Sequence, residues 1–171
     1  MNVNQVPVYV VIPTYNEAQS IPVLLKEILE LGIKNINILI VDDNSPDGTA
    51  KVARCYARNN ELSVSILSRP TKKGLGSAYV EGFKEVLLGL SEEEVFVVQM
   101  DADMSHNPSY LPGMIELLAR NDVVVGSRYC QEGGSDEKWS VYRKGLSAGG
   151  NRAIRFVSGL KVNDCTSGFK I

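Results

Sequence analysis

Cysteine and histidine are scarce in this chain of 171 residues, which contains three cysteines and one histidine. Cys55, Cys130 and Cys165 are odd in number and lie far apart in the sequence. A disulfide framework needs paired cysteines, and a structural zinc site needs closely spaced thiol or imidazole ligands. The sequence argues against both, and we expect reduced thiols of the kind found in cytoplasmic proteins.

Long apolar runs and an excess of charge of one sign are also missing. No apolar run approaches the roughly 20 residues of a membrane-spanning helix, and the first residues lack the basic and then apolar pattern of a signal peptide. The formal net charge of −2 gives no indication of general nucleic-acid binding. We therefore expect a cytoplasmic protein, with peripheral contact at the cytoplasmic face of a membrane as its closest approach to lipid.

The glycine-rich fingerprints of two classes of nucleotide-binding enzyme are absent as well. The segment Gly74–Gly76 lacks the third glycine of the dinucleotide-binding motif and the Gly-Lys-Ser/Thr sequence of a P-loop. We therefore reject a Rossmann dehydrogenase and a P-loop nucleoside triphosphatase.

The chain does have the composition of one ordinary globular domain, with 44% hydrophobic and 22% charged residues. Valine-rich runs alternate with segments of helical periodicity, which predicts an α/β fold with a largely parallel sheet. Strands are predicted at 6–12, 36–41, 62–67, 95–100 and 123–125, and the segment 162–171 is left open as strand or loop. Helices are predicted at 20–32, with Ser20 as N-cap, and at 49–58, 79–90, 108–118 and 139–160, the last as one bent helix or two shorter ones.

The strand predicted at 95–100 ends on two carboxylates one residue apart, Asp101 and Asp103. Side chains two residues apart in an extended chain point the same way, and two carboxylates on one side repel each other unless a cation lies between them. Such a pair suits Mg²⁺ or Mn²⁺ holding a substrate phosphate. An isolated pair of this kind is more often a solvated loop, so the interpretation depends on the other strand ends.

Those other strand ends carry Tyr15 and Glu17, Asp42 and Asp43, and Arg128. The carboxyl ends of parallel strands meet at one edge of a sheet, where ligands bind. An aromatic ring for a base, carboxylates for base or ribose, and a cation for phosphate together indicate a nucleotide site. Each residue has a simpler alternative: Tyr15 as a surface aromatic, and the two aspartates as the start of a turn or a helix cap.

Two further features are interpreted as structural rather than chemical. Lys72 and Lys73 are expected to be a solvated pair rather than a phosphate clamp. His106, the only histidine, is expected to order its turn rather than to act as a base or ligand.

Six motifs occur in an order that resembles the family 2 glycosyltransferases with the GT-A fold, and among these the polyprenol (dolichol) monophosphate mannose synthases. The motifs are IPTYNE at 12–17, VDDNSPDGT at 41–49, GLGSAY at 74–79, DADMSH at 101–106, GSRY at 126–129 and DCTSGFK at 164–170. The resemblance implies a Rossmann-like three-layer sandwich with a mostly parallel central sheet and helices on both faces. It also implies that residues 1–171 form a single GT-A domain that lacks the C-terminal part of full-length relatives.

The resemblance also implies site residues. Donor binding is implied for Pro13, Tyr15, Glu17, Val41, Asp43, Asp101, Ala102, Asp103 and Arg128. The catalytic residues implied are Asp101, Asp103 and Arg128, and the ligands of Mg²⁺ or Mn²⁺ are Asp103, Asp101 and Ser105, where Ser105 stands at a position that is often glutamine in the family. Contacts to an acceptor phosphate are implied for Arg143 and Ser147, with a solvated amphipathic helix as the alternative.

The function implied is an inverting, metal-dependent glycosyltransferase that moves mannose from GDP-mannose to a polyprenyl (dolichyl) monophosphate. Two alternatives stay open: a transferase of the same fold that uses a UDP-sugar, such as a glucosyltransferase, and a non-catalytic nucleotide-sugar-binding subunit. The expected partners are the sugar nucleotide, the polyprenyl phosphate, a membrane surface and a membrane-anchored subunit. Because Tyr15 and Asp43 follow strand ends, we expect Tyr15→Ala and Asp43→Ala to weaken nucleotide binding without unfolding the domain.

Overall fold

The computed structural model describes residues 3–89, 94–129, 141–159 and 162–171, without the side chains of 4, 141–146, 148 and 153. Cys130 and the segment 131–140, which includes the first residues of the helix predicted at 139–160, lie outside the described residues. The strands are β1 (Val8–Thr14), β2 (Ile36–Asp42), β3 (Val64–Ser68) and β4 (Phe96–Gln99). The helices are α1 (Ser20–Glu30), α2 (Thr49–Asn59), α3 (Leu75–Leu88), α4 (Leu111–Leu117) and α5 (Val141–Ser158), with 3-10 turns at Val3–Gln5 and Pro108–Tyr110.

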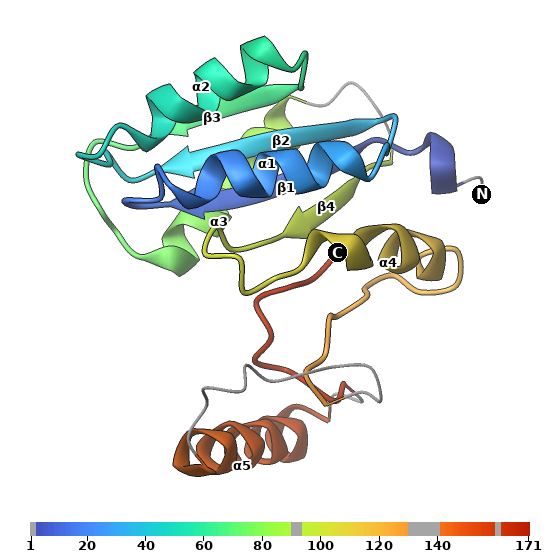
Figure 1. Cartoon of the computed structure of the whole chain (residues 1–171). Helices are drawn as coiled ribbons and strands as arrows, with labels where there is room; N and C mark the ends of the chain where they lie inside the picture. Colours follow the sequence, from blue (N-terminus) through green and yellow to red (C-terminus); the bar gives the residue numbers. More distant parts are fainter. Residues whose placement is uncertain (1–2, 90–93, 130–140, 160–161) are drawn as a thin grey trace.

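The four strands form a parallel sheet in the order β3-β2-β1-β4. β1 is central, with Ile12 opposite Ile40 of β2 and Val10 opposite Val98 of β4. Each strand is a short run of apolar, mostly β-branched residues, which suits burial on both faces of a parallel sheet. The carboxyl ends of β1, β2 and β4 consequently lie along one edge (Figure 1).

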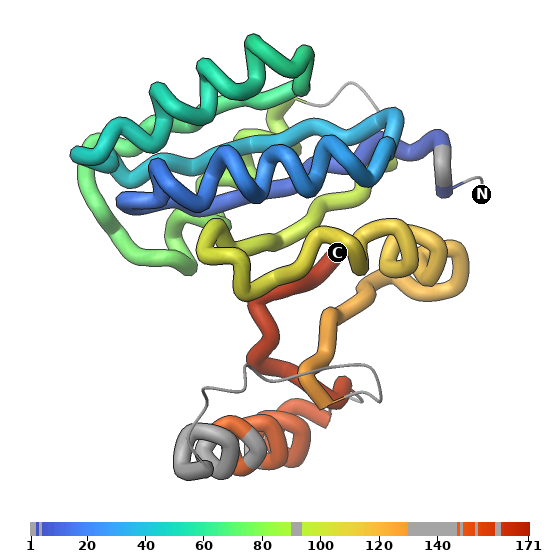
Figure 2. The backbone as a smooth tube through the Cα atoms, viewed as in Figure 1, coloured from blue at the N-terminus to red at the C-terminus, as the bar shows by residue number. Residues whose placement is uncertain are grey.

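Helices cover both faces of the sheet, as the smooth trace also shows (Figure 2). Val10 and Ile12 of β1 belong to a core cluster with the apolar sides of α1, α2 and α4, whereas Val11 belongs to a second cluster under α3. This division follows from the alternation of side chains along a strand. The three-layer α/β sandwich is therefore confirmed.

Glycine allows α3 to lie close to the sheet. A Cβ atom at Gly82 would come within 2.6 Å of a side-chain methyl group of Val11 and within 3.0 Å of one of Val41. Neither neighbour has free space in a packed core, so the third layer depends on a residue without a side chain at this position.

The last residues of the chain extend the sheet in the opposite direction. Lys170 exchanges backbone hydrogen bonds with Gln99 of β4, of 2.8 Å and 3.3 Å, and Ile171 exchanges two of 2.9 Å with Val124. The segment 169–171 therefore runs antiparallel between β4 and 124–126, and the sheet is mostly, not wholly, parallel. The prediction of a regular strand at 123–125 is wrong, because this stretch forms only an isolated bridge at Val125 and Val123 is 62% exposed.

The predicted helical segment 139–160 contains one helix, α5, which runs through Gly145, Gly149 and Gly150. It lies beyond the β4 edge, apart from the sandwich (Figure 1). Among the described helices, none combines the length and apolar character needed to cross a membrane.

Candidate active site

A cavity of about 280 Å³ opens at the carboxyl edge of the sheet. The end of β1, the loops after β1, β2, β3 and β4 and the start of α3 supply its walls. Its lining residues are Pro13, Thr14, Tyr15, Glu17, Asp43, Lys72, Leu75, Ala78, Asp101, Ala102 and Asp103. The structure thus brings together seven of the nine residues expected at the donor, all except Val41 and Arg128.

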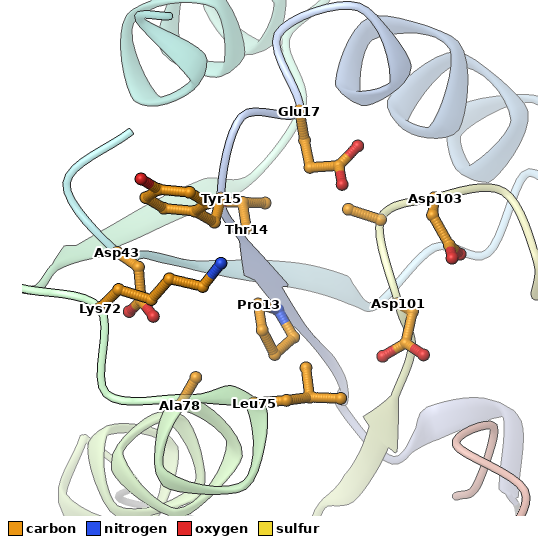
Figure 3. A pocket seen from close by; sticks show the side chains of 11 residues that line it. Pro13, Thr14, Tyr15, Glu17, Asp43, Lys72, Leu75, Ala78, Asp101 and Asp103 are labelled. Carbon is orange, nitrogen blue, oxygen red and sulfur yellow. The ribbon is translucent and has the colours of Figure 1, made fainter. Parts of the chain in front are cut away.

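The cavity has two chemically different ends (Figure 3). Tyr15, Asp43 and Lys72 lie at one end, and Asp101 and Asp103 lie at the other. The first end offers an aromatic face, a carboxylate and an ammonium group, whereas the second offers only carboxylates. The arrangement suits an elongated ligand with a planar base at one end and metal-bound phosphates at the other.

Tyr15 presents its ring at the base end of the cavity and is 38% exposed. The ammonium nitrogen of Lys72 lies 3.9 Å from the ring centroid, a cation–π contact. Lys72 therefore lines the cavity, whereas the sequence predicted only a solvated side chain. Its neighbour Lys73 is exposed, with its ammonium nitrogen 3.8 Å from Glu81.

The carboxylate of Asp43 is held from the protein interior by Arg69, which is only 2% exposed. Arg69 Nε donates to Asp43 Oδ1 at 2.5 Å, and the rest of the guanidinium group contacts the start of α3, at Ser77, Glu81 and the carbonyl oxygen of Gly74. Sequence reasoning missed Arg69; the available signal was an arginine directly after an apolar strand, on the ligand edge of the sheet.

Asp42, adjacent to Asp43, has a structural role, in agreement with the simpler alternative. Its carboxylate accepts hydrogen bonds from the hydroxyl groups of Thr14, at 3.0 Å, and Ser45, at 2.6 Å. It thereby joins the end of β1 to the turn after β2. Of the two aspartates, only Asp43 faces the cavity.

Glu17 lines the cavity from the turn before α1, and its backbone N–H donates to Thr49 Oγ1 at 2.9 Å. The hydroxyl group of Ser20 donates a short hydrogen bond to the Glu17 carboxylate. The prediction that Ser20 is the N-cap of α1 is wrong, since Gln19 precedes the helix and Ser20 is its first residue. The Ser20 hydroxyl instead orients a side chain of the site.

Asp101 is oriented from two directions. Its Oδ1 accepts a hydrogen bond of 2.6 Å from the hydroxyl group of Tyr79, and its backbone N–H donates to His106 Nδ1 at 2.9 Å. Burial lowers the pKa of His106, and because Nδ1 accepts, the proton of the neutral ring is on Nε2. The ring stacks on Phe169 with a centroid distance of 5.3 Å. The expectation that His106 orders its turn is confirmed.

The environment of Asp103 favours an ionised carboxylate. Burial raises its pKa, but hydrogen bonding from Ser105 outweighs this effect, so that the pKa lies below its usual value. The backbone N–H of Ser105 donates to Asp103 Oδ1 at 3.0 Å, which leaves Oδ2 directed elsewhere. Within the described ranges, no group of three or more histidine, cysteine, aspartate or glutamate side chains forms a complete metal cage. Two carboxylates and a nearby hydroxyl fit Mg²⁺ or Mn²⁺ that also binds substrate phosphates.

The C-terminal segment closes tightly against this end of the cavity. A Cβ atom at Gly168 would lie 2.9 Å from the His106 ring and 3.1 Å from Asp101 Oδ2. Only glycine permits this approach without displacing one of the two side chains. The close contact explains why a motif near residue 170 accompanies the one at 101–106.

The two expected donor residues outside the cavity lining have other surroundings. The side chain of Val41 is fully buried in the core under α3, because it points away from the cavity edge into the sheet–helix interface. Arg128 forms a two-pronged ion pair with buried Asp164, at 2.8 Å and 2.9 Å, and donates to Thr166 at 2.8 Å. The side chain of Val41 therefore does not line the cavity, and contact of Val41 with the donor stays a prediction.

Ser147 of α5 lies beside the segment that carries Arg128. The hydroxyl group of Ser147 is 2.8 Å from the hydroxyl group of Tyr129, which follows Arg128 in the sequence. The side chain of Arg143 lies outside the described residues. A second cavity of about 280 Å³ adjoins this region and is lined by Tyr129, Asn151, Arg155 and Asn163.

Comparison with known proteins agrees with this geometry. Residues 9–171 match the model of the family described as Glycosyl transferase family 2. The chain is 40% identical to an undecaprenyl-phosphate mannosyltransferase of Micrococcus luteus, covering 95% of the chain and 65% of the relative. It is 38% identical to a dolichol-phosphate mannosyltransferase of Pyrococcus furiosus, covering 95% of the chain and 45% of the relative. The chain thus spans about half to two thirds of the length of these relatives.

Solved structures show the same fold. The mannosyltransferase PcManGT of Pyrobaculum calidifontis, in complex with GDP-Man and Mn²⁺, has a TM-score of 0.58 at 25% identity over 72% of this chain and 36% of that one. A glucosyl-3-phosphoglycerate synthase of Mycobacterium tuberculosis has a TM-score of 0.63 at 20% identity over 97% of this chain and 55% of that one. The sheet, its ligand edge and the match over 9–171 place this chain in glycosyltransferase family 2.

Proposed function

We propose that this chain carries the donor site of an inverting, metal-dependent mannosyltransferase that uses GDP-mannose and a polyprenyl monophosphate. The observation that carries the proposal is the cavity at the carboxyl edge of the sheet, which has an aromatic and carboxylate end at Tyr15 and Asp43 and a carboxylate end at Asp101 and Asp103. The names of the two relatives, an undecaprenyl-phosphate and a dolichol-phosphate mannosyltransferase, support the choice of sugar and acceptor. The GDP-Man and Mn²⁺ in the complex of PcManGT support the donor and the metal.

The residues of this chain would act mainly by binding and orientation. Tyr15 would stack on the base and Asp43 would accept a hydrogen bond from it. Asp103, helped by Asp101, would hold Mg²⁺ or Mn²⁺, which when bound neutralises charge on the departing diphosphate. Stabilisation of developing charge by groups already in place is usually the largest part of such catalysis.

The acceptor side is proposed to lie at Arg128 and Ser147, with Arg143 on the same helix as Ser147. A phosphate monoester is anionic near neutral pH, so its oxygen needs positioning rather than deprotonation. Attack by this oxygen from the side opposite the leaving diphosphate inverts the configuration at the anomeric carbon. This geometry needs no carboxylate acting as general base, and the carboxylates of the cavity remain free for the metal.

Contact with a membrane surface belongs to this proposal, because the acceptor is a lipid. On α5, Phe156 and Val157 are 90% and 85% exposed, and Arg152 and Arg155 are exposed as well. Apolar side chains beside cations suit an interface of anionic head groups. A membrane-anchored partner subunit, also expected from the sequence, would strengthen an attachment of this kind.

The deciding experiment combines binding and turnover. Calorimetry with GDP-mannose and with UDP-glucose, each with Mn²⁺, identifies the donor. Incubation of radiolabelled donor with dolichyl or undecaprenyl phosphate then measures transfer to lipid, with Asp103→Asn as the inactive comparison. We expect binding of GDP-mannose and formation of mannosyl lipid. Preference for UDP-glucose would instead establish the UDP-sugar alternative, and tight binding without turnover would establish a nucleotide-sugar-binding subunit.

A further inference from the structure

Arg69 is buried more completely than any other described charged side chain near the donor cavity, yet it does not line it. It stands at the end of β3, where its backbone N–H donates to the carbonyl oxygen of Asp42 at 2.8 Å. A buried guanidinium group is costly unless charge and hydrogen bonds compensate it. Its partners therefore indicate what it is there to hold.

Those partners lie on two elements. Nε donates to Asp43 Oδ1, while the terminal nitrogens contact Ser77 Oγ at 2.9 Å, Glu81 Oε1 at 3.3 Å and the Gly74 carbonyl oxygen at 3.4 Å. The donors of the guanidinium fork are thus directed into the protein, between the end of β2 and the start of α3. The fork fixes one carboxylate oxygen in position, and Arg69 itself does not line the cavity.

The other oxygen of Asp43 has a different environment. Oδ2 accepts no hydrogen bond from any described residue. Among the described residues, every side-chain oxygen or nitrogen atom that is buried has a hydrogen-bond partner. Oδ2 must therefore be accessible, and the accessible surface of Asp43 is the cavity that it lines. The base end of the cavity consequently ends in one fixed hydrogen-bond acceptor.

A fixed acceptor discriminates between bases. The ring nitrogens guanine N1 and uracil N3 carry a proton, whereas the corresponding ring nitrogens of adenine and cytosine present a lone pair that a carboxylate repels. A site built to accept a hydrogen bond from an N–H group rejects analogues that lack it. The discrimination depends on the orientation of Asp43, and that orientation depends on the fork of Arg69.

We propose that Arg69 is a specificity-determining positioning residue, which aims Asp43 Oδ2 into the cavity and thereby selects a nucleotide whose ring nitrogen carries a proton. The inference rests on the proposed function, because it takes the Tyr15 and Asp43 end as the base site. It adds a residue that never touches the ligand. Lysine cannot replace arginine here, since an ammonium group carries its donors on one nitrogen atom and lacks the planar fork that holds both Asp43 and the start of α3.

The test measures the affinity of GDP, UDP, ADP and inorganic pyrophosphate by calorimetry with Mn²⁺. The proteins are the wild type, Arg69→Met, Arg69→Lys and the control Glu81→Gln, which removes the charge of a partner of Arg69 without touching Asp43. In both Arg69 variants we expect the affinity of the preferred nucleotide, GDP or UDP, to fall about tenfold or more, while those of ADP and pyrophosphate change little. Glu81→Gln should keep the wild-type ratio of preferred nucleotide to ADP.

Two results would overturn the proposal: a wild-type ratio in the Arg69 variants, or an equal loss for all four ligands, which would show a purely structural role. Thermal melts identify folded variants, and Arg69→Lys decides if Arg69→Met does not fold, since lysine keeps a positive charge opposite Asp43. A wild-type protein that binds all three nucleotides no better than pyrophosphate would refute the base site of the proposed function itself. A selective wild type with equally selective variants refutes the role of Arg69 alone.

Discussion

The hydroxyl group of Tyr79 donates a hydrogen bond of 2.6 Å to Asp101 Oδ1, and so links the core under α3 to the tip of β4. Burial raises the pKa of Tyr79 far above its usual value, so the hydroxyl group keeps its proton and acts as the donor. The remaining oxygen of Asp101 is 3.8 Å from His106 Nε2. A residue of the helical layer therefore decides how a carboxylate of the active site is presented.

Replacing Tyr79 by phenylalanine removes this hydrogen bond with little change in volume. We expect Tyr79→Phe to weaken Mn²⁺-dependent binding of GDP by about 1–1.5 kcal/mol, because Asp101 loses the group that orients it. Calorimetry measures the effect. Tyr9→Phe is the matched control, since Tyr9 packs against the same core cluster and its hydroxyl group makes no hydrogen bond to the residues that the structure describes. Equal GDP affinity in Tyr79→Phe and the wild type would contradict this role.

Removal of the metal should act on the diphosphate and not on the nucleoside. With EDTA in place of Mn²⁺, or in Asp103→Asn, we expect GDP affinity to fall at least about tenfold, because charge compensation of the diphosphate is lost. Binding of guanosine should change little. Asp122→Asn, an exposed aspartate away from the cavity, serves as control. If GDP binds equally well in EDTA, the metal site is wrongly assigned.

The two residues of the base end should differ in their effect on stability. Asp43→Ala leaves the buried guanidinium group of Arg69 without its nearest carboxylate, and we expect the free energy of unfolding to fall by about 3 kcal/mol. Tyr15→Ala, at a half-exposed position, should change it by less than about 0.5 kcal/mol. Urea unfolding measures both. The double variant Asp43→Ala/Arg69→Met should recover part of the loss; a double variant as unstable as Asp43→Ala would argue against pairing as the cause.

The ion pair of Asp164 with Arg128 should make the stability of the fold depend on pH in the acid range. Burial raises the pKa of Asp164, but hydrogen bonds from Arg128 and its charge hold the pKa well below its usual value. A depressed pKa stabilises the fold above the unfolded-state value of about 3.9, and this stabilisation is lost as pH falls from there towards the folded-state pKa.

We therefore expect the free energy of unfolding to decline on acidification below about pH 4 more steeply in the wild type than in Asp164→Asn, which has no carboxylate to protonate. At pH 7 the variant should be the less stable protein, because Arg128 loses its charged partner. Urea unfolding at a series of pH values measures both effects. Parallel pH profiles in the two proteins would show that Asp164 is not a source of acid sensitivity.

Membrane contact through α5 should be weak and sensitive to salt. We expect co-sedimentation with vesicles containing anionic lipid at low salt, reduced at high salt because the charges of Arg152 and Arg155 are screened. Phe156→Ser should weaken binding at both salt concentrations, since it removes an exposed apolar side chain. Lys26→Ala, on the exposed side of α1, is the control. Salt-independent binding, or binding unaffected in Arg152→Ala and Phe156→Ser, would exclude this helix as the contact surface.

Much of the fold could be predicted from the sequence because strands and helices have local patterns of apolar and polar residues. Runs such as 36–41 and 95–100 are short, apolar and followed by polar turns, so both the strands and the edge where they end could be predicted. The prediction for 123–125 was wrong for a physical reason. This stretch pairs with residues 169–171, far away in the sequence, and three consecutive valines do not show whether they form a regular strand or a single antiparallel bridge.

The candidate site divides in the same way. Tyr15 and Asp103 stand directly after strands and were found from their position. Arg69 and Tyr79 act on the cavity from inside the protein, and no local pattern indicates that their partners are Asp43 and Asp101. The burial of the Val41 side chain away from the cavity could not be predicted for a related reason, because a motif identifies a segment and not which face of the sheet each side chain occupies.

Every residue that lines the donor cavity comes from the first 103 positions of the chain. Arg128, Ser147 and the second cavity belong to the part of the chain after β4. If the acceptor lies at Arg128 and Ser147, as proposed above, its site can therefore change in the later segment without any change in the residues that line the cavity. Chimaeras joined after the β4 tip, with Gly168 retained against His106, should exchange acceptors between relatives and keep the nucleotide of the N-terminal parent.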